Sequence, residues 1–251
     1  MTKGIRYYTT IAKTIVRNAF GLKLEPEVGA LKLFLLPGSI CFDIGAAFGR
    51  YTLALSRLAG HSGHIYCFEP AEYSYAILAH ILKFYRLKNA SIAKMALLDT
   101  RGSKTLALPI KKHSNHHPIV GHSLAHLVTP SDSNYVAETV PATTIDHYMA
   151  EARIPRLDFI KCDVEGAELL VFKGGLSTLK RYKPTILCEV YQAWLKRFDA
   201  TPEEVYQFFT QLGYQAFVIE NGTLKEVRCL SEDRNYFFID PKTSRTQTGR
   251  A

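Results

Sequence analysis

Carboxylate side chains stand at the ends of two apolar runs in this 251-residue sequence, and carboxylates can accept a proton. Asp163 comes directly after the run 157–162, and Glu165 lies two residues further on. Residues two apart in extended backbone point to the same side, so we expect these two carboxylates to face one site. Glu189 lies near the end of a second run, 185–190. We predict that Asp163, Glu165 and Glu189 are catalytic, because a carboxylate beside a hydroxyl can take its proton while the oxygen attacks carbon.

The same carboxylates have other interpretations. Paired carboxylates supply oxygen ligands to a divalent metal, and a bound cation would lower the pKa of a hydroxyl. Alternatively, Glu165 and the following Glu168 complement the positive end of a helix dipole, which is the interpretation we favour for Glu168. Glu189 could accept a hydrogen bond from a substrate or support another residue, and the sequence does not separate these two roles.

A loop containing two glycines, residues 43–49, lies between the first predicted strand and the helix after it. Glycine permits positive φ and a close approach of a ligand to the backbone. Gly45 and Gly49 do not have the Gly-x-Gly-x-x-Gly spacing that admits a pyrophosphate, and Asp43 suits a cation better than a diphosphate. Both facts favour S-adenosylmethionine, a sulfonium with an amino-acid tail. Glu69, which ends the second predicted strand, is placed to accept hydrogen bonds from ribose hydroxyls. The alternative is that these glycines only form a tight turn and that Glu69 only caps a helix.

Short β-rich runs alternate with helical periodicity from residue 39 onward. The predicted strands are 39–44, 64–68, 90–98, 106–110, 157–162 and 185–190, then a hairpin of 214–220 and 223–227, and finally 236–239. The predicted helices cover 51–58, 73–84, 143–151, 167–172, 176–181 and 201–212. This alternation predicts a parallel sheet with helices on both faces. The antiparallel end is typical of class I methyltransferases, so we expect an α/β, Rossmann-like, mostly parallel seven-stranded sheet with a C-terminal antiparallel hairpin.

The chain resembles the FkbM family of methyltransferases over about residues 35–240. The segments that carry the resemblance are 42–52, 67–70, 157–168 and 183–189, supported by 121–124 and 143–146. The resemblance implies S-adenosylmethionine as cofactor and O-methylation of a hydroxyl on a sugar, glycan or polyketide-like small molecule. One departure is Ala47, where the family often has Asn.

The resemblance also implies how the cofactor is held. Asp163 lies nearest the methyl group and Glu69 holds the ribose. The methionine part is lined by Asp43, Gly45 and Gly49, and the adenine is approached by Ala96 and Leu97. Their neighbours Ala46, Phe48, Tyr51 and Pro70 complete the predicted cofactor-binding set.

A polar, histidine-rich insert covers residues 111–134, and five of the nine histidines fall between residues 113 and 126. We predict His116, His122 and Ser123 as substrate contacts, because an insert after the third strand can overhang the pocket. The alternatives are a solvated loop and a metal site, although the spacing is not that of helical metal ligands.

The net charge of +8 lies at the two ends of the chain. Residues 1–24 carry five basic and no acidic side chains, and residues 241–251 carry three basic and none acidic, so residues 25–240 are neutral. This charge distribution weakens one alternative of the same fold, a nucleic-acid methyltransferase. The retained Asp43, Glu69 and Asp163 argue against another, a non-catalytic surface-tethered module. We expect a basic helical segment (1–34), a methyltransferase domain (35–240) and a disordered tail (241–251).

The N-terminal helix has two interpretations. Its apolar residues (Ile5, Tyr8, Ile11, Ala12, Ile15 and Phe20) can share one face, which would dock on the domain and help close the acceptor pocket or lie on an anionic membrane. Four of the five cysteines fall in predicted strands, as buried thiols of a reducing compartment. We therefore expect a cytoplasmic protein, with residues 1–24 as a peripheral contact at the inner membrane face. The sequence does not predict the oligomeric state.

Overall fold

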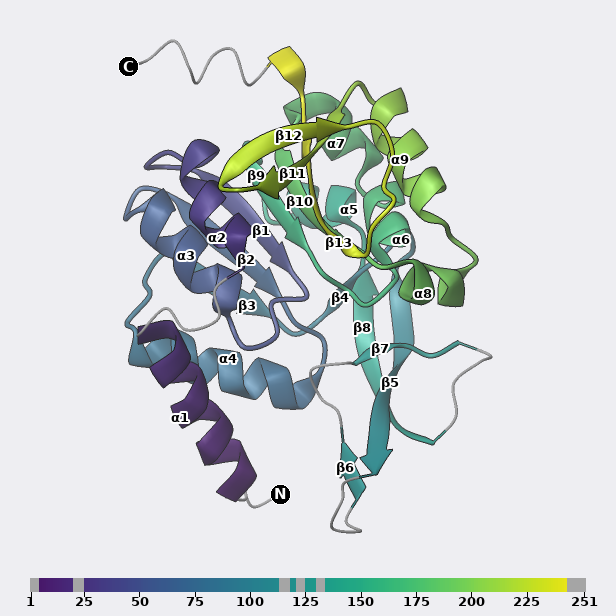
Figure 1. The fold of residues 1–251 in the computed structure, drawn as a ribbon. Helices are drawn as coiled ribbons and strands as arrows, with labels where there is room; N and C mark the ends of the chain where they lie inside the picture. The colour runs from purple at the N-terminus through teal and green to yellow at the C-terminus, as the bar shows by residue number, and fades with distance from the viewer. Residues whose placement is uncertain (1–4, 20–24, 113–117, 121–124, 130–133, 243–251) are drawn as a thin grey trace.

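The computed structural model describes residues 5–19, 25–112, 118–120, 125–129 and 134–242 (Figure 1). Its centre is an eight-stranded sheet. Across the sheet the strands are β12 (Thr223–Val227), β11 (Gln215–Glu220), β13 (Arg234–Ile239), β10 (Thr185–Val190), β9 (Phe159–Cys162), β1 (Ile40–Ile44), β2 (His64–Phe68) and β3 (Ala90–Ala93). The five from β10 to β3 are parallel, and the other three are antiparallel to their neighbours. The predicted Rossmann-like α/β fold is confirmed. The sheet has eight strands where seven were predicted, because β13 lies between β10 and β11 and β12 adds a strand at the edge.

Helices cover both faces of this sheet. Alternate strand residues point to opposite sides, so the sheet contributes side chains to two hydrophobic cores. Phe42 and Ile160 face one hydrophobic core, while Cys41 and Phe159 face the other. The first core is covered by α5 (Ile145–Glu151), α6 (Glu168–Lys173), α7 (Leu176–Tyr182) and α9 (Pro202–Gln211). The second is covered by α2 (Pro26–Ala30), η1 (Leu31–Leu33), α3 (Arg50–Ala59) and α4 (Glu72–Phe84). The short helices α8 (Gln192–Leu195) and η3 (Lys196–Phe198) follow β10.

A second sheet corrects the prediction for residues 90–143. Its strands are β4 (Ala96–Leu97), β8 (Tyr135–Thr143), β5 (Gly102–Lys112) and β6 (Pro118–Val120), with β7 (His126–Leu127) also paired to β5. The single strand predicted at 90–98 is wrong, because β3 and β4 belong to different sheets. The strand predicted at 106–110 is far longer, and it continues into the predicted insert. β8 was missed because Pro141 and Glu138 hide its alternation.

Several local signals are confirmed. The Thr201 side chain accepts a hydrogen bond from the Glu204 backbone N–H (3.2 Å), and the Glu204 side chain accepts one from the Thr201 N–H (2.9 Å), so a capping box begins α9. Asn221 and Gly222 form the hairpin turn with positive φ at both positions. Cys41, Cys67, Cys162 and Cys188 are buried, which raises the pKa of each thiol, whereas Cys229 is exposed.

The helix α1 (Ile5–Ala19) lies against α4 (Figure 1). The buried Tyr7 donates a hydrogen bond to the Ala76 carbonyl (3.1 Å). The predicted apolar face is therefore shifted, because Ile5 and Tyr8 are 87% and 58% exposed. Contact of this exposed side with a membrane stays a prediction. In the described part of the chain, no helix is long and apolar enough to cross a membrane. Of the predicted disordered tail, residues 243–251 lie outside the described residues.

Candidate active site

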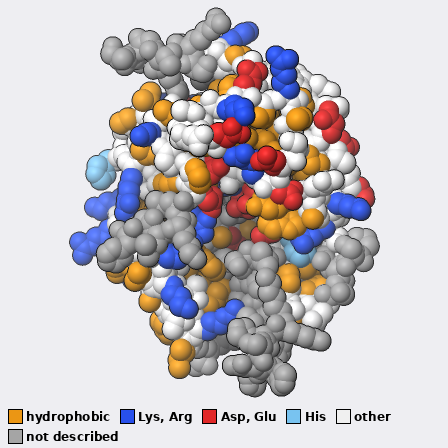
Figure 2. Space-filling view, in the orientation of Figure 1, with side chains coloured by type: hydrophobic (Ala, Val, Ile, Leu, Met, Phe, Trp, Pro, Cys, Tyr) orange, Lys and Arg blue, Asp and Glu red, His pale blue; other side chains and the backbone are white. Residues whose placement is uncertain are grey.

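Two adjoining cavities lie at the carboxyl ends of β1, β2 and β9, and acidic side chains gather near the centre of this face of the molecule (Figure 2). We call the first the apolar slot; it has a volume of about 110 Å³, and Phe68, Glu69, Met95, Leu97 and Leu106 are among its lining residues. We call the second the polar chamber; it has a volume of about 290 Å³, and Arg17, Asn18, Glu25, Asp43, Arg50 and Lys161 are among its lining residues. Gly45, Ala47 and Asp163 line both, so one elongated ligand can extend from slot to chamber.

The glycine loop forms the boundary between slot and chamber. At Gly45, φ is +76°, and a Cβ atom would lie 1.8 Å from the Asp163 carbonyl oxygen, so the loop and the end of β9 approach as closely as only glycine allows. Ala47 also has a positive φ of +46°, a conformation that Asn tolerates better than Ala. Gly49 does not line either cavity; it lies directly before α3 with φ +81°.

Glu69 lies at one wall of the apolar slot. One carboxylate oxygen accepts a hydrogen bond from the Ala47 N–H (2.8 Å), and the other accepts one from the Ala71 N–H (3.0 Å). Burial raises the pKa of Glu69 to about 7, although both hydrogen bonds oppose this shift. Each oxygen keeps a second lone pair for a ribose hydroxyl. The predicted residues Pro70, Ala96 and Leu97 line the same slot, whose apolar walls suit a purine ring.

Asp43 lies in the wall of the polar chamber. Its carboxylate is 2% exposed and accepts a hydrogen bond from the Thr52 hydroxyl (2.6 Å). Burial raises the pKa of Asp43 to about 6. Ala46, Phe48 and Tyr51 line the same chamber, so these predicted residues lie together.

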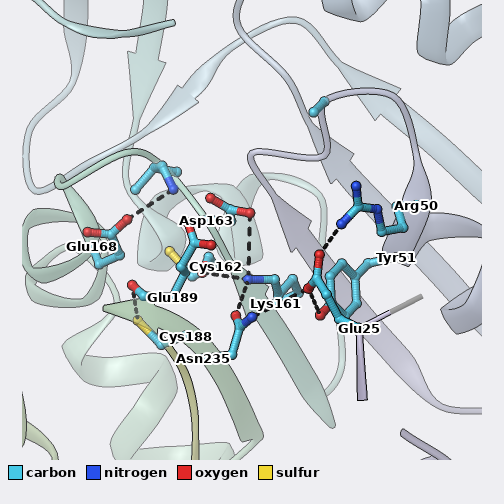
Figure 3. Close-up of polar contacts among 12 residues, drawn as sticks. Glu25, Arg50, Tyr51, Lys161, Cys162, Asp163, Glu168, Cys188, Glu189 and Asn235 are labelled. Carbon is cyan, nitrogen blue, oxygen red and sulfur yellow. Dashed lines mark hydrogen bonds and ion pairs between the residues drawn. The ribbon is translucent and has the colours of Figure 1, made fainter. Parts of the chain in front are cut away.

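A buried lysine, which the sequence analysis did not select, lies between the chamber and the catalytic candidates (Figure 3). The Lys161 ammonium is 3.0 Å from the Asn235 Oδ1 and 3.8 Å from an Asp163 carboxylate oxygen. Burial lowers the pKa of Lys161, but the attraction of Asp163 and Glu189 outweighs it, so the pKa lies above its ordinary value. A lysine inside an apolar strand was the available signal, because such a charge needs partners.

Glu25 was also missed. Its carboxylate pairs with Arg50 and accepts hydrogen bonds from the Tyr51 hydroxyl (2.5 Å) and the Asn235 side-chain amide (3.4 Å). It joins a segment before the first strand to α3 and β13 (Figure 3). No spacing in the sequence points to such a contact, because its partners lie up to 210 residues away.

The three predicted catalytic carboxylates have different surroundings. Asp163 lies where slot and chamber meet, and its side chain is 35% exposed. Glu189 lines neither cavity; burial and the nearby Asp163 carboxylate raise the pKa of Glu189. Glu165 lines the slot, but the expectation of extended backbone there was wrong, because φ is +58° and the chain turns. Glu168 accepts hydrogen bonds from the backbone N–H groups of Val164 and Gly166 (3.1 Å each), which is a structural role.

The histidine-rich insert contributes three described residues to the apolar slot, of which His126 is the only histidine: Ala125, His126 and Leu127. His126 is buried and lines the apolar slot. The predicted substrate contacts His116, His122 and Ser123 lie outside the described residues and stay predictions. Among the residues that the structure describes, no group of three or more His, Cys, Asp or Glu side chains is arranged to hold a metal ion.

Strand order, glycine loop and acidic strand ends together define the Rossmann-like fold of class I methyltransferases. Residues 43–216 match the family model described as "Methyltransferase FkbM domain". The chain therefore belongs to the FkbM methyltransferase family, which confirms the resemblance. A search of the curated proteins finds no match.

Three solved structures are among those to which the chain is similar. The chain is similar to the FkbM methyltransferase from Methylobacillus flagellatus KT, with a TM-score of 0.52 and 16% identity over 93% of this chain and 58% of that one. It is also similar to a SAM-dependent methyltransferase from Aquifex aeolicus, with a TM-score of 0.47 and 16% identity over 86% of this chain and 89% of that one. For an O-methyltransferase from Bacillus cereus in complex with SAH, the TM-score is 0.49 at 11% identity, over 92% and 90% of the two chains. At 16% identity, the likeness to the Methylobacillus flagellatus structure shows the fold alone.

Proposed function

We propose that the protein transfers the methyl group of S-adenosylmethionine to a hydroxyl oxygen of a sugar, a glycan or a polyketide-like small molecule. The observation that carries this proposal is the position of Asp163 at the junction of the apolar slot and the polar chamber. A cofactor with its adenosine in the slot and its methionine tail in the chamber would place its sulfonium group at this junction. A partly exposed carboxylate there is suited to receive a proton from an attacking hydroxyl.

The residues present fit the cofactor. The slot offers apolar walls for adenine, and Glu69 has free lone pairs for the ribose hydroxyls. In the chamber, Asp43 offers a negative charge to an ammonium group, and Arg17 and Asn18 of α1 line the same chamber. When bound, the cofactor supplies a methyl carbon that is open to displacement from a sulfonium.

The side chains of this site then have separate tasks. Asp163 accepts the hydroxyl proton as the oxygen attacks. Lys161, at 3.8 Å, places a positive charge beside the Asp163 carboxylate. Burial and the nearby Asp163 carboxylate raise the pKa of Glu189, so Glu189 holds its proton more strongly than an ordinary glutamic acid. Asp163 is therefore the carboxylate of this cluster that takes the hydroxyl proton.

The test is a methyl-transfer assay with cofactor labelled in the methyl group. Sugars, glycolipid precursors and polyketide-like alcohols serve as acceptors, with RNA as a comparison and with and without a chelator. We expect labelled product only with a hydroxyl acceptor, and mass spectrometry should locate the new methyl ether on oxygen. If S-adenosylhomocysteine at millimolar concentration gives neither heat in calorimetry nor a thermal shift, the proposal is wrong. Methylated RNA without methylated alcohols would also overturn it.

A further inference from the structure

We infer that the last turn of α1 binds the carboxylate of the cofactor's methionine tail, through the side chains of Arg17 and Asn18. This inference rests on the proposed use of S-adenosylmethionine and extends it to a segment before the family-matched region, which begins at residue 43. Thr14, Arg17 and Asn18 line the polar chamber. Residues three and four apart share one side of a helix, so this spacing presents all three side chains to the chamber together.

The helix is fixed in this position by contacts with α4 and with the residue that follows it. Besides the Tyr7 hydrogen bond, the Thr10 hydroxyl lies 3.3 Å from the Tyr73 hydroxyl. The Tyr85 hydroxyl donates to the Ile15 carbonyl (3.1 Å), one turn before Asn18. These contacts hold the C-terminal end of α1 beside the glycine loop. Ile15 of α1 and Phe48 of the loop pack against one hydrophobic cluster.

Among the described residues, no acceptor is recorded for the side-chain donors of this turn. The Asn18 side-chain nitrogen is buried and has no hydrogen-bond partner among the described residues. Leaving a buried donor unpaired is unfavourable, so an acceptor on a ligand there would stabilise the complex. Arg17 forms no ion pair within the described part of the chain.

The other cations of the chamber are already engaged. Arg50 is paired with Glu25, and Lys161 with Asn235 and Asp163. The unpaired donors are therefore on the α1 wall, and the buried Asp43 carboxylate also lines the chamber. A chamber with donors contributed by α1 and a carboxylate contributed by β1 matches the carboxylate and the ammonium of an amino acid.

A purely structural role for Arg17 is the competing explanation, because a cation in the last turn complements the negative end of the helix dipole. Such a role would affect the stability of α1 without recognising a carboxylate. Ligands that differ in this one group separate the two explanations.

Calorimetry would compare S-adenosylmethionine with its decarboxylated analogue, which keeps the sulfonium and the ammonium. In R17A/N18A, we expect the affinity for S-adenosylmethionine to fall about 10- to 100-fold, the usual range for losing hydrogen bonds to a charged group. The affinity for the decarboxylated analogue should change less than about twofold. The control K13A removes a positive charge from an exposed position of the same helix and should bind both ligands as wild type does.

Three results would overturn the inference. Equal losses for both ligands would mean that the substitutions only displace α1. Unchanged affinity for S-adenosylmethionine with a raised acceptor KM would assign the two side chains to the acceptor. Wild-type protein that binds neither ligand would contradict the proposed function itself, and the inference with it. The variant N18D is a second test that does not depend on removing side chains from α1. It places a carboxylate beside the ligand carboxylate, so it should weaken the binding of S-adenosylmethionine but not that of the decarboxylated analogue.

Discussion

The apolar slot and the polar chamber adjoin, yet they are built in different ways. The slot is formed largely by residues at or just after the ends of β1, β2, β4 and β9, each within a short motif. The chamber brings together α1, Glu25, the glycine loop and Lys161, which is held by Asn235 from β13. Local motifs thus account for the apolar slot, which suits the adenosine part of a ligand. The polar chamber, which holds the charged side chains, depends on contacts between segments that are distant in the sequence.

Asp163, the carboxylate that lines both cavities, should show the largest effect. In D163N, the side chain keeps its size but cannot accept the hydroxyl proton, so we expect kcat to fall about 10²- to 10⁴-fold. The affinity for S-adenosylhomocysteine should stay within about threefold. D99N is the matched control, because Asp99 is exposed and lines neither cavity. Equal losses in both variants would refute the assignment of Asp163 as the base.

The slot is tested next, through Glu69. The substitution E69Q removes the charge and leaves one acceptor oxygen, so at least one charge-assisted hydrogen bond to the ribose is lost. We expect the affinity for S-adenosylhomocysteine to fall about 10-fold, with the acceptor KM unchanged. The decarboxylated cofactor should lose affinity equally, in contrast to its behaviour in R17A/N18A. A selective loss for one of the two ligands would break the proposed division between slot and chamber.

Stability of the free protein should decrease as the pH rises from 6 to 8. Burial raises the pKa of both Glu69 and Glu168 to about 7, so the folded state binds protons that the unfolded state has already released. Protonation of each group therefore stabilises the folded state. This contribution is fully present below the unfolded pKa near 4.5, and it is lost as the pH rises through the folded pKa of about 7. Over this interval the loss is about 1 kcal/mol per group. Urea unfolding at both pH values measures it, and E168Q should show a smaller decrease than wild type.

The smallest effect concerns Ala47, which lines both cavities. The substitution A47G relieves the positive φ at this position, and we expect a gain in unfolding free energy of about 1 kcal/mol at most. Thermal unfolding followed by circular dichroism would detect a rise in Tm of a few degrees at most. A lower Tm would show that the methyl group contributes packing that outweighs the strain.

Sequence reasoning succeeded where chemistry and local structure coincide. Asp43, Glu69 and Asp163 each end or follow a parallel strand, and the carboxyl ends of such strands meet at one edge of a sheet. It failed for Glu25 and Asn18, whose roles depend on where a helix packs. Neither residue breaks any periodicity, so no local pattern distinguishes it from a surface residue. The second sheet was missed for a related reason, since its long strands contain Pro109 and Pro141 and depend on pairing between β5 and β8.

The distribution of cysteines offers a route to spectroscopy. Four thiols are buried and hard to ionise, and Cys229 alone of the five is exposed. Because thiol-reactive dyes attack the accessible thiolate, the unaltered protein should accept one fluorophore at residue 229. A second cysteine introduced in place of Lys13 would then give a donor–acceptor pair reporting the distance between α1 and the loop before β13. Energy transfer could thus follow the position of α1 as cofactor is added, with no native residue of the site replaced.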